Sequence, residues 1–241
     1  MVYEGRLLPG NRLPSEESLC EELGVSRVTV REALLYLEQE GFITRRQGLG
    51  TFVHPSAFRS KGRIETETCF NQLLRRIGYS RISVEGDIWE DKAVEPWAEL
   101  LQVPVGEPVL MFTRLFLADG RPVIYCKNHI PMSFLKLPIS DLDANYQGNL
   151  FRLLWIWCGQ EITHRTAWFK ARAVTEEISE KMGMPIGTPI FSWDEVQCNI
   201  EDKVVCLSEN YFDTVAVPLC SMRRTWRWGD AEDQDAEENG R

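Results

Sequence analysis

The sequence predicts an α+β protein with a small N-terminal module and a larger C-terminal module. Four observations carry this prediction. Residues 9–53 hold two short helical patterns and then a tight hairpin pattern, and residues 109–130 hold two long apolar strands around an Ala-Asp-Gly turn. A polar, basic stretch at residues 54–65 separates them and is typical of a linker. Strands and helices alternate around antiparallel hairpins in the larger module, which favours helices packed on one sheet.

The composition is that of an ordinary globular protein. The chain has 241 residues, of which 44% are apolar and 26% are charged, and this length suits one or two domains. No apolar run approaches the roughly 18 residues of a membrane span, and the start of the chain lacks the apolar core of a signal peptide. We therefore expect a cytoplasmic protein. The seven cysteines show no C-x-x-C spacing, so we expect them to pack as free thiols.

The distribution of charge is more informative than the net charge of −9, which by itself argues against a nucleic-acid partner. Residues 230–241 hold six acids and one base and are typical of a solvated, disordered tail. Residues 1–59 hold seven bases and eight acids and are therefore close to neutral. Four of those bases are grouped in two short segments: Arg27, Arg31, Arg45 and Arg46.

The N-terminal module begins with two helices. Ser15 follows a breaker-rich loop and suits the N-cap of a first helix, which Gly24 ends. Ser26 then caps a second helix that runs to about Glu40. Apolar residues at spacings of three and four predict the buried stripes: Leu19 and Leu23 in the first helix, and Val30, Ala33, Leu34 and Leu37 in the second.

A hairpin follows the second helix. Residues 42–46 and 51–53 suit two strands, and Gln47 to Gly50 suit the turn between them. Two helices joined by a short turn, with exposed arginines on the first turns of the second, match helix-turn-helix geometry, and a hairpin that carries arginines matches a wing. The helix spacing alone also fits any small helical hairpin.

The run PGNRLPSEESLCEELGVSRVTVREALLYLEQEGFITRRQGLGTFV at residues 9–53 resembles the winged-helix domain of the GntR transcription regulators. The resemblance implies a double-stranded DNA operator as partner, with phosphate contacts from Ser26 and Thr51 and a minor-groove contact from the wing. The implied DNA-binding residues are Ser26, Arg27, Thr29, Arg31, Arg45, Arg46, Gln47, Gly48, Gly50 and Thr51. Two features depart from the family pattern. Glu17 stands where members commonly carry an arginine, and the helix that usually precedes the PG loop is short or missing.

The larger module is expected to alternate strands and helices. The predicted helices cover residues 70–77, the region of Ala98 to Leu101, residues 150–158 and residues 176–182. The predicted strands cover 81–88, 109–117, 121–130, 161–173, 189–198 and 203–212. The hairpins at 109–129 and 189–213 share the order strand, acidic turn, strand, which suggests an internal duplication.

The segments Leu101–Val109, Arg114–Val123 and Lys181–Ile190 resemble the UTRA effector domain, which is paired with the GntR winged helix in the HutC-type subfamily. This resemblance implies a chorismate-lyase-like α/β sheet domain that binds a small-molecule effector and forms a homodimer. A dimer suits a pseudo-palindromic operator. The expected domains are a winged helix-turn-helix at 1–55, a linker at 56–66, the UTRA domain at 67–228 and an acidic tail at 229–241. The expected function is that of a ligand-responsive repressor.

The predicted effector pocket differs from that of relatives that sense phosphorylated sugars. Those relatives carry R-x-R on the first hairpin strand, a Glu on its partner strand and Ser-x-Tyr at the next helix. Only one of these arginines is present here, so a sugar phosphate is not expected. The predicted effector-binding residues are Arg114, Phe116, Cys126, Asn149, Phe151, Ser208, Asn210 and Tyr211. Phe116 and Phe151 also fit a purely structural role in the core.

An enzyme is the alternative class, because the implied fold is shared with a lyase. The candidates for it are Cys126, His129 and Glu209, which match no recognised catalytic motif. Function follows from sites and not from folds, so a regulator is expected and not an enzyme. Cys126 and His129 supply only half of a structural zinc site, and the sequence predicts no metal and no cofactor.

Overall fold

The computed structural model describes residues 12–46, 48–54, 62–64 and 69–221. The chain divides into two compact units, one of Met1–Glu65 with Cys220–Arg241 and the other of Thr66–Leu219. The expected acidic tail at 229–241 lies outside the described residues. No helix in the described part of the chain is both long enough and apolar enough to cross a membrane.

The first unit consists of two helices and a two-stranded hairpin. Its elements are α1 (Glu16–Leu23), α2 (Arg27–Gln39), β1 (Ile43–Arg46) and β2 (Gly50–Val53). Ser15 and Ser26 cap the two helices by accepting hydrogen bonds from the backbone N–H of Ser18 and Thr29, as the sequence predicts. Gly24 ends α1 with a φ of 66°, the left-handed conformation that glycine adopts most readily.

The core of the first unit joins both helices to the hairpin. Its buried residues are Leu19, Val30, Leu34, Ile43 and Val53. The prediction that Leu23 and Ala33 are buried is wrong, because both are exposed. Leu23 is the last residue of the two-turn helix α1, and Ala33 lies on the flank of the stripe that Val30 and Leu34 form.

Part of the expected linker packs on the first unit. Arg63 is 3% exposed, donates from Nη2 to the backbone oxygen of Glu40 and lies 4.7 Å from the ring centroid of Phe42. Residues 62–64 also pair in parallel with Cys220, through hydrogen bonds of 2.8 and 3.0 Å. The two chain segments that connect the units are therefore hydrogen-bonded to each other.

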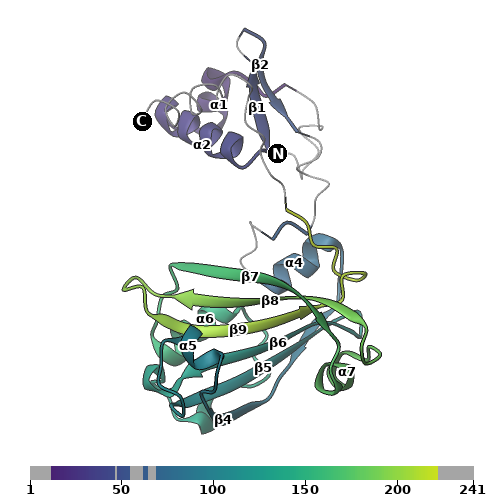
Figure 1. The fold of residues 1–241 in the computed structure, drawn as a ribbon. Helices are drawn as coiled ribbons and strands as arrows, with labels where there is room; N and C mark the ends of the chain where they lie inside the picture. The colour runs from purple at the N-terminus through teal and green to yellow at the C-terminus, as the bar shows by residue number, and fades with distance from the viewer. Residues whose placement is uncertain (1–11, 47, 55–61, 65–68, 222–241) are drawn as a thin grey trace, which may run out of the picture. The chain divides into compact units, whose positions relative to one another are not determined.

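The second unit is a seven-stranded antiparallel sheet with helices on both faces (Figure 1). The strand order is β3-β5-β6-β9-β8-β7, and β4 pairs with β5 beside β3. The strands are β3 (Ile82–Glu85), β4 (Ile88–Lys92), β5 (Pro108–Ala118), β6 (Arg121–Pro131), β7 (His164–Ala173), β8 (Pro189–Cys198) and β9 (Val204–Phe212). The helices are α4 (Phe70–Ile77), α5 (Trp97–Leu101), α6 (Leu150–Cys158) and α7 (Glu176–Met182), with 3-10 turns at Met132–Phe134 and Ile139–Asp141.

The single strand predicted at residues 81–88 is wrong, because the edge of the sheet is divided into β3 and β4. The division falls at Gly86, where a Cβ atom would collide with the backbone oxygens of Thr113 and Ala144. The backbone oxygen of Asp87 accepts from the N–H of Thr113 at 2.9 Å. The edge strand thus bends at a glycine that allows close approach of two other segments.

The sheet supports the predicted duplication. Each half contributes an edge strand, a helix and a hairpin, and the halves meet where β6 pairs with β9. The turns before the two hairpins make matching hydrogen bonds: Gly106 N–H donates to the oxygen of Ala93, and Gly187 N–H donates to the oxygen of Val174, both at 2.8 Å.

Different helices pack on the two faces of the sheet. On one face, the α5 face, α5 packs on Met111 and Leu207 at one end and α7 packs on Tyr125 and Tyr211 at the other. On the opposite face, the α6 face, α6 packs on an apolar cluster of β5, β6 and β9. Phe70 of α4 contacts aromatic rings on the α6 face (Phe116, Trp193 and Phe212). Figure 1 shows α5 in front of the sheet and α6 behind it.

Candidate functional sites

The first turns of α2 present the predicted DNA-contacting side chains. Ser26, Arg27, Thr29 and Arg31 are all exposed, and the side chains of Arg27 and Arg31 are 68% and 61% exposed. Ser26 Oγ lies 2.8 Å from Thr29 Oγ1, so this capping pair fixes the start of the helix. Four of the predicted residues therefore lie exposed at the start of α2.

An acid from α1 lies at the same surface. Glu16 Oε2 accepts from Nε of Arg31 at 2.8 Å and from Nε of Arg27 at 3.5 Å. The hydrogen bond from Arg31, aided by the charges of both arginines, holds the pKa of Glu16 below its usual value. In the sequence, Glu17 is the acid that replaces a family arginine; the acid that contacts Arg27 and Arg31 is its neighbour Glu16.

The hairpin presents one of its two predicted arginines. Arg46 is exposed, and its guanidinium carbon lies 5.6 Å from the ring centroid of Phe52. The backbone of Arg12, which precedes α1, forms an isolated antiparallel β-bridge with Phe52. The Arg12 guanidinium lies where a Cβ on Gly50 would be, so the glycine makes room for it. The reasoning from sequence missed Arg12, whose only signal was one more base in the loop before Ser15.

The turn of the hairpin lies beside these arginines. Gly48 has a φ of 74° and is exposed, which suits close approach of its backbone to a ligand. Thr51, in the returning strand, is half-buried. Gln47 lies outside the described residues.

Arg45 has a structural partner that the sequence did not indicate. Its backbone N–H donates to Glu38 Oε1 at 3.1 Å, its Nε lies 3.5 Å from Glu38 Oε2, and its Nη2 donates to the backbone oxygen of Arg31. Neighbouring residues on a strand point to opposite sides, so Arg45 and Arg46 cannot both face one ligand. The structure assigns Arg45 to the contact between hairpin and α2.

The second candidate site lies on the α6 face of the sheet. Two neighbouring rows of side chains cross β5, β6, β9 and β8 there, and we call them the polar rows. The first row is Arg114, Cys126, Asn210 and Trp193, and the second is Phe112, Asn128, Ser208 and Glu195. Four of the predicted effector residues are therefore cross-strand neighbours on one face: Arg114, Cys126, Ser208 and Asn210.

Arg114 is a buried cation in this site. It is 4% exposed, its Nη2 donates to the backbone oxygens of Tyr146 and Gly148, and its guanidinium carbon lies 4.8 Å from the ring centroid of Phe116. Burial lowers the pKa of Arg114, and no carboxylate among the described residues is paired with its guanidinium, whose hydrogen bonds go to backbone oxygens. A buried cation without an anionic partner is energetically costly, so this position favours an anion.

Three polar atoms around the polar rows are buried and make no hydrogen bond to the described residues: Nε of Arg114, Nε1 of Trp193 and Oε1 of Gln197. Native proteins leave few such atoms unsatisfied, and each calls for a partner. Trp193 and Gln197 both project onto this face from β8. Together they offer two donors and one acceptor to a molecule bound there.

A hydrogen-bonded chain connects the second row to β8. Ser208 Oγ donates to Asn128 Oδ1 at 2.7 Å, and Gln197 Nε2 donates to Ser208 Oγ at 3.0 Å and to Glu195 Oε2 at 3.1 Å. Burial raises the pKa of Glu195 despite the charge of Arg165. The reasoning from sequence missed Asn128, Trp193, Glu195 and Gln197, although the strict alternation of side chains along paired strands could have indicated them.

The remaining predicted residues on this side have structural partners. Asn149 caps α6 by accepting from the backbone N–H of Arg152 at 2.7 Å, and the Arg165 guanidinium lies 5.3 Å from the ring centroid of Phe151. Phe116 packs edge-on against Phe70, with ring centroids 5.5 Å apart. Burial raises the pKa of Cys126 to about 12, so its thiol stays neutral.

The prediction that Tyr211 shares the pocket with Asn210 is wrong, because the two are adjacent on β9 and point to opposite faces. Tyr211 lies on the α5 face, where its hydroxyl donates to Glu209 Oε2 at 3.1 Å. Glu209 Oε1 lies 3.0 Å from His129 Nε2. Cys126 is on the other face, so the structure separates it from His129 and Glu209.

A cavity of about 360 Å³ also opens on the α5 face. It is lined by Glu85, Gly86, Asp87, Thr113, Leu115, Tyr125, Asn145 and Lys181. None of the predicted effector residues lines it. Two of its charged groups, Lys181 and Asp87, already form an ion pair with each other at 3.2 Å. The unsatisfied polar atoms of Arg114, Trp193 and Gln197 lie instead on the α6 face. We therefore place the candidate effector site at the polar rows.

Comparisons with known proteins agree with this organisation. Residues 1–53 match the model of bacterial regulatory proteins, gntR family, and residues 87–217 match the UTRA domain. The HTH-type transcriptional regulator YurK of Bacillus subtilis is 27% identical over 209 residues, covering 86% of this chain and 84% of YurK. The HTH-type transcriptional repressor NagR of the same organism is 27% identical over 189 residues, covering 78% of this chain and 76% of NagR. The crystal structure of YydK from Bacillus subtilis shares the fold, with a TM-score of 0.72, 19% identity and coverage of 92% and 94%.

Proposed function

Since the chain belongs to the gntR family of bacterial regulatory proteins and carries a UTRA domain, we propose a specific form for its activity as a ligand-responsive, DNA-binding transcription regulator. It acts in the cytoplasm as a homodimeric repressor, and a small organic anion bound at the polar rows changes its affinity for a pseudo-palindromic operator. NagR, a relative of similar length, is a transcriptional repressor. Two-fold protein symmetry maps onto two half-sites of an operator.

The exposed start of α2 supports the DNA-binding part of the proposal. The guanidinium groups of Arg27 and Arg31 suit base edges and phosphates, and the positive end of the α2 dipole lies beside them. Arg46 and the glycine turn of the hairpin suit the neighbouring backbone or minor groove. These contacts neutralise phosphates, so binding depends steeply on salt.

The unpaired charge of Arg114 is the observation that carries the effector assignment. A carboxylate beside its Nε would satisfy both the unbonded donor and the buried charge. Trp193 Nε1 offers a further donor on the same row. A phosphate with two charges calls for a second cation, and the first-row neighbours Cys126 and Asn210 are neutral. We therefore assign a monoanion and not a sugar phosphate.

The surroundings also suit a molecule with a flat apolar part. Phe116, Trp193 and Phe212 form an aromatic wall at one end of the polar rows, where Phe70 of α4 contacts all three. Offset or edge-on contact with such rings stabilises a planar ligand. The amides and carboxyl of the second row suit hydrogen bonds along its edge.

The loop before α6 connects the ligand site at Arg114 with α6, so a change in this loop on ligand binding is transmitted to the helix. Arg114 holds this loop by donating to the backbone oxygens of Tyr146 and Gly148, and the loop leads directly to the cap of α6 at Asn149. An anion that engages the guanidinium competes with these two acceptors. The protein has one conformation that binds operator tightly and one that binds it weakly. The ligand changes operator affinity only to the extent that its own affinity differs between these two conformations.

A thermal-shift screen tests the proposal on the full-length protein. The panel pairs small carboxylates with and without a ring against sugar phosphates and neutral sugars. A ligand that binds only the folded state raises the melting temperature, and the account predicts that ring-bearing monocarboxylates give the largest increase. A panel in which sugar phosphates raise the melting temperature most would overturn the assignment of a monoanion. Operator-binding assays with the same compounds then test whether the hits change DNA affinity.

A further inference from the structure

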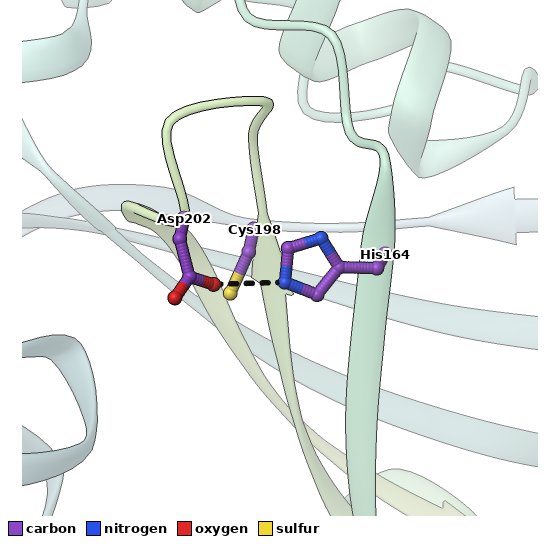
Figure 2. A group of neighbouring side chains, drawn as sticks. All are labelled: His164, Cys198 and Asp202. Carbon is purple, nitrogen blue, oxygen red and sulfur yellow. Dashed lines mark hydrogen bonds and ion pairs between the residues drawn. The ribbon is translucent and has the colours of Figure 1, made fainter.

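Three potential metal ligands meet at one end of the sheet, outside the polar rows. His164 begins β7, Cys198 ends β8, and Asp202 lies in the turn between β8 and β9 (Figure 2). His164 and Cys198 are directly paired across the two strands. The side chains come from segments far apart in the sequence, and strand register brings them together.

The donor atoms of these three side chains converge. His164 Nε2 lies 2.9 Å from Asp202 Oδ1, and the imidazole, thiol and carboxylate atoms all lie within 4.8 Å of one another. Figure 2 shows the Cys198 thiol pointing to the gap between imidazole and carboxylate. Cys198 is 6% exposed, whereas the side chains of His164 and Asp202 are 51% and 85% exposed. A cation could therefore enter from solvent on the side of the histidine and aspartate.

We propose that His164, Cys198 and Asp202 form a Zn²⁺ site with three protein ligands and one water. A thiolate, an imidazole and a carboxylate are the donor types that Zn²⁺ prefers, whereas Mg²⁺ and Ca²⁺ take oxygen ligands. In a tetrahedral site with bonds of about 2.0–2.3 Å, neighbouring donors lie about 3.6 Å apart. The donor atoms already lie within 4.8 Å of one another, and the two exposed side chains are free to rotate toward that spacing.

The surroundings already hold the ligands in place. Thr163 Oγ1 lies 3.0 Å from His164 Nδ1 and 3.4 Å from the backbone oxygen of Cys198, to which it donates. The hydroxyl can then accept a hydrogen bond from Nδ1–H, which leaves Nε2 free to bind the metal. Partners of this kind on the second ring nitrogen are the usual support of a metal-bound histidine.

The turn that carries Asp202 is also fixed. Asn199 Oδ1 accepts from the backbone N–H groups of Glu201 and Lys203, each at 3.0 Å, and Asn199 Nδ2 donates to Gln160 Oε1 at 2.8 Å. Asp202 adopts a φ of 60° there, which aspartate and asparagine tolerate better than most residues. The carboxylate is therefore presented from a defined position.

Binding replaces the thiol proton of Cys198 by the cation. This proton leaves to the buffer, and the neutral imidazole of His164 keeps its one proton on Nδ1, so that Nε2 can bind the metal. Affinity therefore increases with pH, because fewer protons have to be displaced.

Cobalt titration of the full-length reduced protein tests the site. Co²⁺ takes zinc sites and gives a thiolate-to-metal charge-transfer band, so the account predicts this band with one equivalent of Co²⁺ and its loss when Zn²⁺ is added. Cys198→Ser removes the band. The exposed changes His164→Gln and Asp202→Asn weaken Co²⁺ binding by about tenfold or more. Asparagine keeps the backbone conformation of residue 202, so a loss of affinity there reports the carboxylate.

Matched controls separate this site from the other thiols and imidazoles. Cys20→Ser and His54→Gln change a partly exposed cysteine and a histidine of the first unit, and both should leave the band unchanged. A thermal melt of each variant confirms that it is folded. A wild-type protein without the band in excess Co²⁺ would overturn the proposal, and so would a band that survives in Cys198→Ser with unchanged affinity. Neither result bears on the effector site at the polar rows.

Discussion

Glu16 of α1 accepts a 2.8 Å hydrogen bond from Nε of Arg31, a residue at the start of α2. The same oxygen atom also accepts from Arg27 at 3.5 Å. The two arginines that we propose as DNA contacts are thus held by one carboxylate. DNA phosphates must compete with Glu16 for these guanidinium groups, and the carboxylate itself repels phosphates.

Replacing Glu16 with Gln should strengthen operator binding about two- to fivefold, because exposed ion pairs of this kind are worth at most about 1 kcal/mol. Fluorescence anisotropy with labelled operator DNA measures the change. Glu22→Gln is the matched control, since Glu22 is an exposed acid of the same helix. Weaker binding by Glu16→Gln would mean that the acid positions the arginines and does not compete with DNA.

Replacing Arg31 with Ala should weaken DNA binding and lower its dependence on salt. Each lost phosphate contact reduces the slope of log affinity against log salt by about 1. The measurement is a series of operator titrations between about 50 and 200 mM salt. Arg75→Ala serves as control because Arg75 is an exposed base of the second unit. An unchanged slope in Arg31→Ala would remove this residue from the DNA interface.

Replacing Gly86 with Ala should destabilise the second unit by about 1–3 kcal/mol, since the new Cβ would meet two backbone oxygens that cannot rotate away. Gly120→Ala is the comparison: Gly120 has a φ of 84° and open space around it, so its cost is limited to about 1 kcal/mol of backbone strain. Urea denaturation measures both. Equal losses of unfolding free energy in Gly86→Ala and Gly120→Ala would contradict the role of Gly86 in bending the edge strand.

The buried carboxylate of Glu209 should make the second unit sensitive to acid. Burial raises the pKa of Glu209, but the hydrogen bond and charge of His129, with the charge of Lys127, outweigh this and hold the pKa below its usual value. In the unfolded chain the group titrates near about 4.3. The stabilisation is therefore present above that pH and is lost as the pH falls through the lower folded value.

Glu209→Gln should accordingly lower stability by about 1–3 kcal/mol at neutral pH, and the difference from wild type should shrink as the pH falls below about 4. Melting temperatures across this range measure it, with the exposed Glu99→Gln as control. A difference in melting temperature between wild type and Glu209→Gln that stays the same down to the lowest pH would contradict this link between stability and the protonation of Glu209.

Local sequence signals predicted most of the elements. Ser15, Gly24 and Ser26 set the helix ends because capping depends on a few neighbouring residues, and the Asp119-Gly120 turn set the first long hairpin. The bend at Gly86 was not predictable in this way, because its cause is the approach of Thr113 and Ala144 from other parts of the chain.

The candidate sites depend on register and burial, which local patterns do not determine. Placing Tyr211 beside Asn210 overlooked the alternation of side chains along β9. Trp193 and Gln197 lie next to the site only because β8 pairs with β9, and the sequence does not indicate that pairing. Arg45 carried the right charge for DNA, but tertiary contact with Glu38 directs it to α2.

The most direct test of the account is the release of operator DNA by an effector in wild type and in Trp193→Phe. This change removes the unsatisfied Nε1–H together with the five-membered ring that carries it, and keeps an aromatic ring on the first polar row. For a monocarboxylate that stabilises the wild type, the account predicts that Trp193→Phe binds operator normally but needs about tenfold more ligand for half-release, which corresponds to a lost hydrogen bond to a charged group. An identical ligand response in both proteins would contradict the placement of the effector site at the polar rows.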